Sequence, residues 1–218
     1  MTDAALLRQR DHAYSSFTEK LLSRDIQPGQ IISQRELTEL TGMPLAAIRE
    51  MIPRLEADGL IRTVPKRGLQ VLSIDIELVR NAFQLRSIIE GRAIVEFCRT
   101  AFTDEIQDLL QQHLEIRERA SAGVSPDVLK TAQRIDWAFH DRIIDAMNNP
   151  LVSNIHRVNA LKIRLIRNSD TRMLPELVVS VLDEHLAILR ALEIRNSTGA
   201  LEAIEAHIES GKRRALGV

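Results

Sequence analysis

The sequence predicts a mainly α-helical protein. We expect an N-terminal winged helix-turn-helix with a small β-hairpin wing over residues 1–73. We expect an all-α antiparallel bundle of about six helices over residues 76–218. Two observations predict this fold. Signals for a short helix, a tight turn, a second helix and a hairpin follow one another between Ser33 and Val71. After Asp75, apolar residues recur at helical spacing between turn signals.

The composition limits the classes of protein to which the chain can belong. Hydrophobic residues make up 44% of the 218 residues and aromatic residues 3%, which suits helices packed with Leu, Ile, Val and Ala. The formal net charge of −1 means that any contact with nucleic acid must come from local clusters of positive charge. The lone cysteine, Cys98, excludes an internal disulfide and has apolar neighbours, so we expect a small buried side chain. We find no signal-like or membrane-spanning apolar run, and we expect a soluble, cytoplasmic protein.

The first element is a helix over residues 4–24, followed by a short helix with clear signals at both ends. Ser33 and Glu36 have the spacing of a capping box, in which each side chain satisfies a free backbone amide of the other residue. Ile32 precedes the cap as a hydrophobic staple would. Gly42 is expected to end this short helix.

Pro44 opens the second helix of the motif, because its missing N–H is not needed in the first turn. We expect Gly59 to end this helix. Pro53 lies inside it, removes one internal hydrogen bond and should bend the helix axis. One apolar stripe is predicted to pack inward, namely Leu45, Ile48, Ile52 and Leu55.

A hairpin follows, with strands at residues 60–64 and 69–72 and a turn of sequence Pro-Lys-Arg-Gly between them. Lys66 and Arg67 lie at its tip. A second helix of this kind can enter the major groove of DNA, while a basic hairpin tip contacts phosphates or an adjacent groove. The alternative is a small helical module with a surface hairpin that contacts no DNA.

These motifs resemble the N-terminal domain of GntR-type bacterial transcription regulators. The resemblance lies in Pro-Gly before the short helix, in RLEADGLI at residues 54–61, and in the pattern P-x-R-G-x-x-V in the wing. It implies that Arg35 and Arg49 contact DNA, and that Gly68 lets the wing backbone approach it closely. Pro44 and Leu45 stand where many relatives have Ser or Thr followed by Arg. We therefore expect one polar contact at Leu45 to be missing and the DNA sequence bound to differ from the common one.

The rest of the chain reads as consecutive helices separated by turn signals such as Gly123 to Pro126, Asn148-Asn149-Pro150 and Ser169-Asp170. Within this region three helices each direct a polar, metal-capable side chain inward. Asp136 and His140 share one otherwise apolar helix face, and His185 and His207 each lie in an apolar stripe. The predicted helices cover residues 76–101, 103–120, 126–147, 150–168, 174–194 and 197–215.

A buried carboxylate is costly unless it is paired or coordinated, and imidazole with one carboxylate suits a divalent transition metal, with Zn or Ni preferred. The alternative is a local ion pair of Asp136 with His140 and two satisfied core histidines.

Two segments of this region, residues 135–152 and 183–208, resemble the C-terminal FCD ligand-binding domain of the FadR subfamily of GntR regulators, in particular its VanR-like group. The resemblance implies a metal held by one Asp and three His, matched here by Asp136, His140, His185 and His207. His113 and His156 fall outside the pattern and are expected at the surface.

Arg86 lies on an inward-facing line of the first bundle helix. It could form an ion pair with Glu90 one turn away. The resemblance instead places an arginine here that faces the ligand cavity and receives the carboxylate of an effector. Both interpretations can hold together.

The sequence therefore favours a ligand-controlled regulator, most simply a repressor, that binds a palindromic operator in double-stranded DNA as a homodimer. A small carboxylate would bind the metal and Arg86. One alternative is a DNA-binding protein whose bundle only dimerises around a structural metal. The other is a metal-dependent enzyme, which we do not expect, because the Asp136-x-x-x-His140 pattern lacks the adjacent glutamate base of a zinc protease helix.

Overall fold

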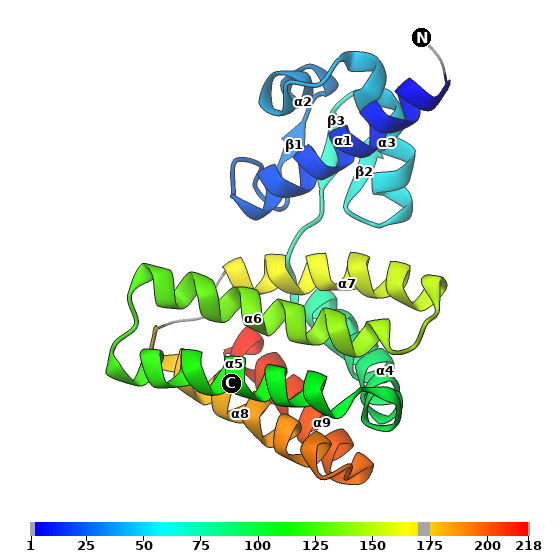
Figure 1. Ribbon diagram of the computed structural model, residues 1–218. Helices are drawn as coiled ribbons and strands as arrows, with labels where there is room; N and C mark the ends of the chain where they lie inside the picture. Colours follow the sequence, from blue (N-terminus) through cyan, green and yellow to red (C-terminus); the bar gives the residue numbers. More distant parts are fainter. Residues whose placement is uncertain (1–2, 170–174, 218) are drawn as a thin grey trace. The chain divides into compact units, whose positions relative to one another are not determined.

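The structure is a computed structural model that describes residues 3–169 and 175–217, with side chains described from 8 to 167 and from 175 to 217. The chain forms two compact units, residues 1–75 and 76–218, which follow one another directly along the sequence. The fold is mainly helical with one small sheet, as predicted (Figure 1).

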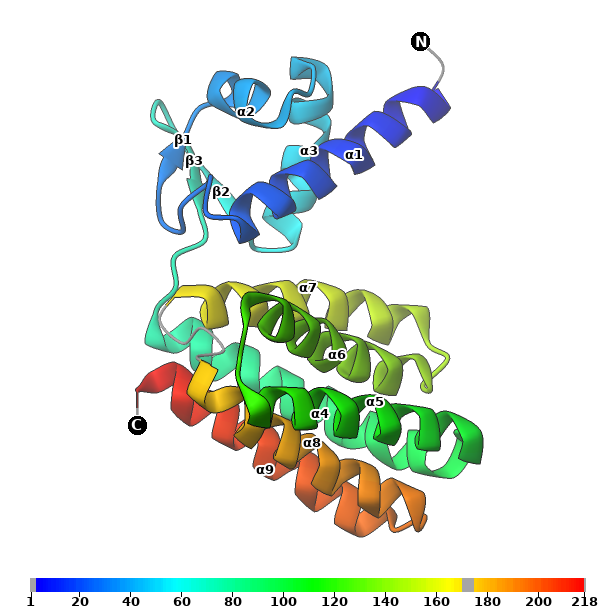
Figure 2. The same cartoon turned by 60° about the vertical axis from the view of Figure 1, so that its left-hand side comes forward.

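The described part of the first unit consists of three helices and a three-stranded antiparallel sheet of order β1-β3-β2 (Figures 1 and 2). Helix α1 packs against both α2 and α3, and its apolar face is fully buried at Ala13, Phe17 and Leu21. The elements are α1 (Asp3–Leu22), β1 (Ile31–Ile32), α2 (Gln34–Thr41), α3 (Leu45–Ala57), β2 (Ile61–Val64) and β3 (Gly68–Val71).

The capping box at the start of α2 is present as predicted. The Ser33 hydroxyl accepts a hydrogen bond of 3.1 Å from the backbone N–H of Glu36, and the Ser33 N–H donates one of 2.7 Å to the Glu36 carboxylate. The helix ends at Gly42, whose φ of 67° is left-handed and suits glycine. These two ends fix α2 as a short element and set the turn that leads into α3.

Helix α3 runs from Leu45 to Ala57 and includes Pro53. Three of the four stripe residues are buried, with Ile48 and Leu55 fully enclosed. The prediction for Leu45 as a core residue is wrong, because it is 40% exposed at the first position of the helix, beyond the edge of the packed face. This exposure places an apolar side chain on the same outer face as Arg49, one turn away.

The sheet has one strand more than the predicted hairpin. Strand β1 pairs with β3 through Ile31 opposite Gln70 and Ile32 opposite Leu69. Gly68 makes this pairing possible: its φ is 116°, and a Cβ there would lie 2.8 Å from the carbonyl oxygen of Ile32. Gly68 therefore has a structural reason within the sheet itself.

The described part of the second unit forms six helices: α4 (Ile76–Thr100), α5 (Thr103–Ala122), α6 (Pro126–Asp145), α7 (Pro150–Ser169), α8 (Pro175–Glu193) and α9 (Ser197–Leu216). Helix α4 packs against α6, α7 and α9, while α8 packs against α5, α6 and α9 (Figure 2). The predicted start of the fifth bundle helix at 174 and part of the turn at 169–170 lie outside the described residues. Cys98 is buried as expected, and burial raises the pKa of its thiol.

None of the helices in the described ranges is both long enough and apolar enough to cross a membrane.

Candidate metal centre and DNA interface

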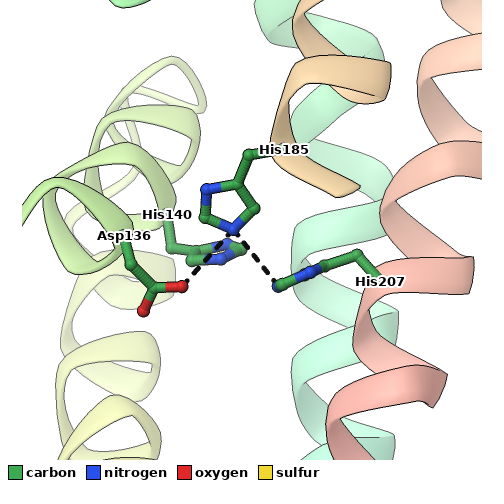
Figure 3. Close-up of side chains that lie close together, drawn as sticks. All are labelled: Asp136, His140, His185 and His207. Carbon is green, nitrogen blue, oxygen red and sulfur yellow. Dashed lines mark hydrogen bonds and ion pairs between the residues drawn. The ribbon is translucent and has the colours of Figure 1, made fainter. Parts of the chain in front are cut away.

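The structure brings the four predicted ligand residues together inside the helical bundle. Asp136 and His140 come from α6, His185 from α8 and His207 from α9, and their side chains point toward one another (Figure 3). One ligand atom from each residue lies within 4.8 Å of the others. All four side chains are buried, with residue exposures of 5% or less.

The shortest distances in the cluster match the spacing of ligands around a metal ion. Nε2 of His185 lies 3.4 Å from Nε2 of His207 and 3.4 Å from Oδ1 of Asp136 (Figure 3). Two ligands at about 2.0–2.1 Å from a tetrahedral zinc are themselves about 3.3–3.4 Å apart. These pairs therefore have the separation that a shared ion requires.

The hydrogen bonds behind His185 determine which of its ring nitrogens carries the proton. Nδ1 of His113 lies 2.7 Å from the carbonyl oxygen of Leu109, which can only accept, so this nitrogen is the protonated one in neutral His113. Nε2 of His113 then accepts from Nδ1 of His185 at 3.2 Å. The Nε2 atom of His185 is left with its lone pair directed at the cluster, as a metal ligand must be.

Carboxylates lie behind the other two histidines. Nδ1 of His207 donates a hydrogen bond of 2.8 Å to Glu184. Nδ1 of His140 lies 2.8 Å from Oε2 of Glu90, an ion-pair distance without hydrogen-bond geometry. A carboxylate beside Nδ1 favours the tautomer protonated there, which again leaves Nε2 free to bind a cation. Neither Glu90 nor Glu184 was predicted from the sequence to support the ligands in this way.

Asp136 is ionised despite complete burial. Burial raises its pKa, but the positive charge of Arg167, whose Nη1 lies 2.6 Å from Oδ2, outweighs this effect and the pKa falls below its usual value. The predicted alternative of an isolated pair between Asp136 and His140 is not what the structure shows, because Arg167 is the ion-pair partner of Oδ2. A carboxylate oxygen therefore remains available to the cluster.

The imidazoles of His185 and His207 are neutral near pH 7. Burial lowers the pKa of His207 to about 4, although Glu184 acts in the opposite direction. Burial also lowers the pKa of His185 well below its ordinary value, and nearby His207 lowers it further. Neutral imidazole is the form that binds a metal ion, so no proton has to be removed first.

Two histidines contradict the prediction that they lie at the surface. His113 is 0% exposed, because α5 turns it inward with Ile106 and Ile116 toward α6 and α8. His156 is 7% exposed and its Nε2 lies 3.0 Å from Asp141. For His113, the helical spacing with Ile106 and Ile116 was the signal in the sequence that could have revealed its burial.

Arg86 is buried, with 6% of its surface exposed, and forms the ion pair with Glu90 that the sequence allowed, at 2.8 Å. Burial raises the pKa of Glu90, but the charge of Arg86 and then His140 lower it to about 2. Arg86 also lines a cavity of about 30 Å³ next to Asp136 and His140. The ion pair is therefore present, and Arg86 also borders this cavity.

The same cavity contains residues that were not predicted from the sequence. Trp137 of α6 and Arg164 and Arg167 of α7 line it. Residues 156, 159, 163 and 167 of α7 recur at intervals of three or four, which is the spacing of one helix face. Polar residues on this face were the available signal.

Most residues expected at DNA are exposed on the first unit, namely Arg35, Leu45, Arg49, Lys66 and Arg67, whereas Gly68 is half-buried. Arg35 forms a surface ion pair with Glu39, and Nε of Arg49 donates a hydrogen bond of 3.2 Å to the side chain of Gln34. Lys66 and Arg67 are exposed at the tip between β2 and β3. Arg35, Arg49 and the wing tip therefore lie at the surface, where contact with DNA is possible.

Each of the two units matches a known protein family. Residues 9–71 match the family of bacterial regulatory proteins named gntR, and residues 81–210 match the FCD domain. The HTH-type transcriptional repressor RspR of Escherichia coli K12 is 26% identical over 196 residues, which cover 87% of this chain and 83% of that protein.

Two solved structures share the fold. A GntR transcriptional regulator from Rhodococcus sp. RHA1 superposes with a TM-score of 0.72 at 17% identity, covering 97% of this chain and 98% of the other. The metal-free FCD domain of TM0439 superposes with a TM-score of 0.56 at 16% identity, covering 66% of this chain and 96% of the other. The FCD domain match spans more than half of the sequence, and with the match at residues 9–71 it shows that this chain belongs to the GntR family of bacterial transcription regulators that carry an FCD domain.

Proposed function

We propose that this transcription regulator is a repressor controlled by a small carboxylate, which binds at a divalent metal held by Asp136, His140, His185 and His207. The proposed effector contacts are the metal and Arg86. The regulator acts in the cytoplasm as a homodimer on a palindromic operator, because two copies of α3 then meet two symmetric half-sites. The relative RspR, which is named a repressor, supports this sign of regulation.

One observation supports the metal assignment most directly. The atoms that face one another in the cluster are all hydrogen-bond acceptors, and no N–H or O–H group of the described residues lies between them to donate a hydrogen bond. The outer hydrogen bonds and carboxylates favour protons on the far nitrogens of all three histidines, so three Nε2 lone pairs and one carboxylate oxygen face each other. Oδ1 of Asp136 and Nε2 of His140 are buried and have no hydrogen-bond partner in the described part of the chain. A cation at the centre satisfies all four atoms at once.

The donor set fits a borderline transition metal, with Zn or Ni preferred, because imidazole nitrogen is a better ligand for these ions than for Mg²⁺ or Ca²⁺. Four protein ligands leave a position for the effector only if the metal accepts more than four ligands. Arg86 lines the cavity beside the cluster and supplies a guanidinium that a carboxylate can bind.

The proposed DNA contacts are Arg35, Leu45 and Arg49 on α2 and α3, and Lys66, Arg67 and Gly68 in the wing. Helix α3 would enter the major groove, where Arg49 reads a base edge or binds a phosphate. The wing tip would supply electrostatic affinity to the backbone. Gly68 contributes through the backbone, since it brings β1 and β3 together below the tip.

Metal analysis of protein purified without added metal tests the proposed site. We expect close to one transition metal ion per chain. Substitutions His185→Ala and His207→Ala should each lower the metal content sharply, whereas His12→Ala, at an exposed position of the first unit, should not. Full metal content in both cluster variants would show that the metal, if any, is bound elsewhere.

A mobility-shift titration with metal-loaded protein and a selected operator tests the control by carboxylates. We expect at least one small carboxylate to weaken operator binding in the parent. Arg86→Lys retains the positive charge that pairs with Glu90 but loses the planar guanidinium that a carboxylate can bind with two hydrogen bonds. This variant should bind metal and operator like the parent, and its operator affinity should change less when the carboxylate is added. A metal that is purely structural predicts instead that no carboxylate changes operator affinity.

A further inference from the structure

The cavity beside the proposed metal site contains polar groups that the proposed function does not use. It lies between α4, α6 and α7. Besides Arg86, its wall includes Arg164, Arg167 and Trp137. Arg167 is engaged by Asp136, whereas the pair of Arg164 and Trp137 has no role in holding the cluster.

Two N–H donors of this pair are buried without an acceptor. Nε of Arg164 and Nε1 of Trp137 have no hydrogen-bond partner among the residues that the structure describes. The guanidinium carbon lies 4.5 Å from the centroid of the indole ring, and Nη2 is 3.5 Å from Asp141. Buried donors in folded proteins are nearly always satisfied. One bound acceptor group next to this stacked pair would satisfy both.

The charges around the cavity indicate the charge of that ligand. Three guanidinium groups line it together with three carboxylates, those of Glu90, Asp136 and Asp141, so the formal charges of the wall cancel. A divalent cation on the proposed ligands adds two positive charges. Because an uncompensated charge is unfavourable in a poorly solvated site, the loaded cavity favours an anion that carries two negative charges.

We propose that the effector is a short dicarboxylate. One carboxylate binds the metal and Arg86, and the other accepts hydrogen bonds from Arg164 and Trp137. This assignment rests on the proposed function, because the metal and the position of the first carboxylate are both part of that proposal. Arg86, Trp137 and Arg164 line one and the same cavity, so a short chain between the two carboxylates is enough to reach both ends. A monocarboxylate of equal length would leave the Arg164–Trp137 pair without its acceptor.

Calorimetric titration of the zinc-loaded, full-length protein tests the proposal, with malonate, succinate, butyrate and inorganic phosphate as probes. We expect succinate or malonate to bind at least tenfold more tightly than butyrate. In Arg164→Gln this ratio should fall close to one, while butyrate affinity and zinc content stay at parental values. Trp137→Phe keeps the ring and should lower the ratio by a smaller factor. Arg157→Gln, at an exposed position of the same helix, is the matched control.

The outcomes separate this inference from the function on which it rests. Equal affinity for succinate and butyrate, or an unchanged ratio in Arg164→Gln, would overturn the dicarboxylate assignment and leave a metal-bound monocarboxylate standing. Tighter binding of phosphate than of both dicarboxylates would also overturn it, in favour of a phosphate ligand. If zinc does not bind, or if no carboxylate binds the zinc-loaded protein, the proposed function itself fails.

Discussion

Replacing His113 tests how the bundle prepares His185 for a metal. The substitution His113→Phe preserves a ring of similar shape, including its edge-to-face contact with Phe139 at 5.2 Å between centroids. It removes the nitrogen that accepts the proton of His185 Nδ1. His185 must then either bury an unpaired N–H or move its proton to Nε2, where it blocks the metal.

The expected losses of stability and of metal affinity can be worked out from the length of the second unit and from the typical cost of losing a buried hydrogen bond. An unpaired buried N–H costs about 1–3 kcal/mol. The second unit has 143 residues (76 to 218), and at about 2.1 cal/mol/K per residue its unfolding entropy is near 0.3 kcal/mol/K. The metal-free variant should therefore melt about 3–10 °C lower than the parent. Removing an outer hydrogen bond from a metal-binding histidine lowers metal affinity by about 10–100-fold.

Calorimetric melting of the metal-free protein and competition titration with a zinc chelator measure these two quantities. His113→Gln offers a carbonyl oxygen as a substitute acceptor and should recover part of the zinc affinity. His12→Phe introduces the same change at an exposed position of the first unit and should alter neither value for the second unit. Parental zinc affinity in His113→Phe would refute the argument that His113 sets the tautomer of His185.

Three further predictions concern the proposed DNA contacts and the histidines of the proposed metal site. Arg49→Ala should keep the fold, because the side chain is exposed, and should weaken operator binding by about 1–3 kcal/mol if it reads a base edge; unchanged affinity in a mobility-shift titration would remove it from the interface. Neutralising Lys66 and Arg67 together should flatten the slope of log affinity against log salt by about 0.9 for each phosphate that the wing no longer neutralises, and an unchanged slope would mean that the wing does not touch the DNA backbone. In metal-free protein, burial lowers the pKa of His207 to about 4 from 6.5. The unfolded chain therefore binds protons first, so the free energy of unfolding in urea should be greatest above pH 6.5 and fall as the pH drops toward 4; a flat profile over this range would contradict it.

The elements of the fold could be predicted where local signals mark their ends. Ser33 with Glu36, Gly42 and Pro126 each have a local reason to start or stop a helix, and this reason depends on no distant residue. Strand β1 could not be predicted in this way. It has only the two residues Ile31 and Ile32, too few to show a period, and exists because β3 pairs with it.

The candidate site shows the same division. Each of Asp136, His140, His185 and His207 lies in an apolar stripe of its own helix, so its inward direction can be read from spacing. Their outer partners depend on which helices become neighbours. Glu184 is next to His185 in sequence but contacts His207 on α9, and His113 reaches His185 from α5. No spacing within one helix contains that information.

The four proposed metal ligands lie late in the sequence, and this affects the order in which a newly synthesised chain acquires its two sites. The ribosome completes the first unit by residue 75, and N-terminal domains generally fold first. Asp136 and His140 emerge later on α6, then His185 on α8, and His207 only with α9. A chain halted before α9 therefore has a finished helix-turn-helix unit and lacks one of the four proposed metal ligands. If the proposed control by metal and carboxylate holds, such a fragment would lack it, and control is acquired last during synthesis.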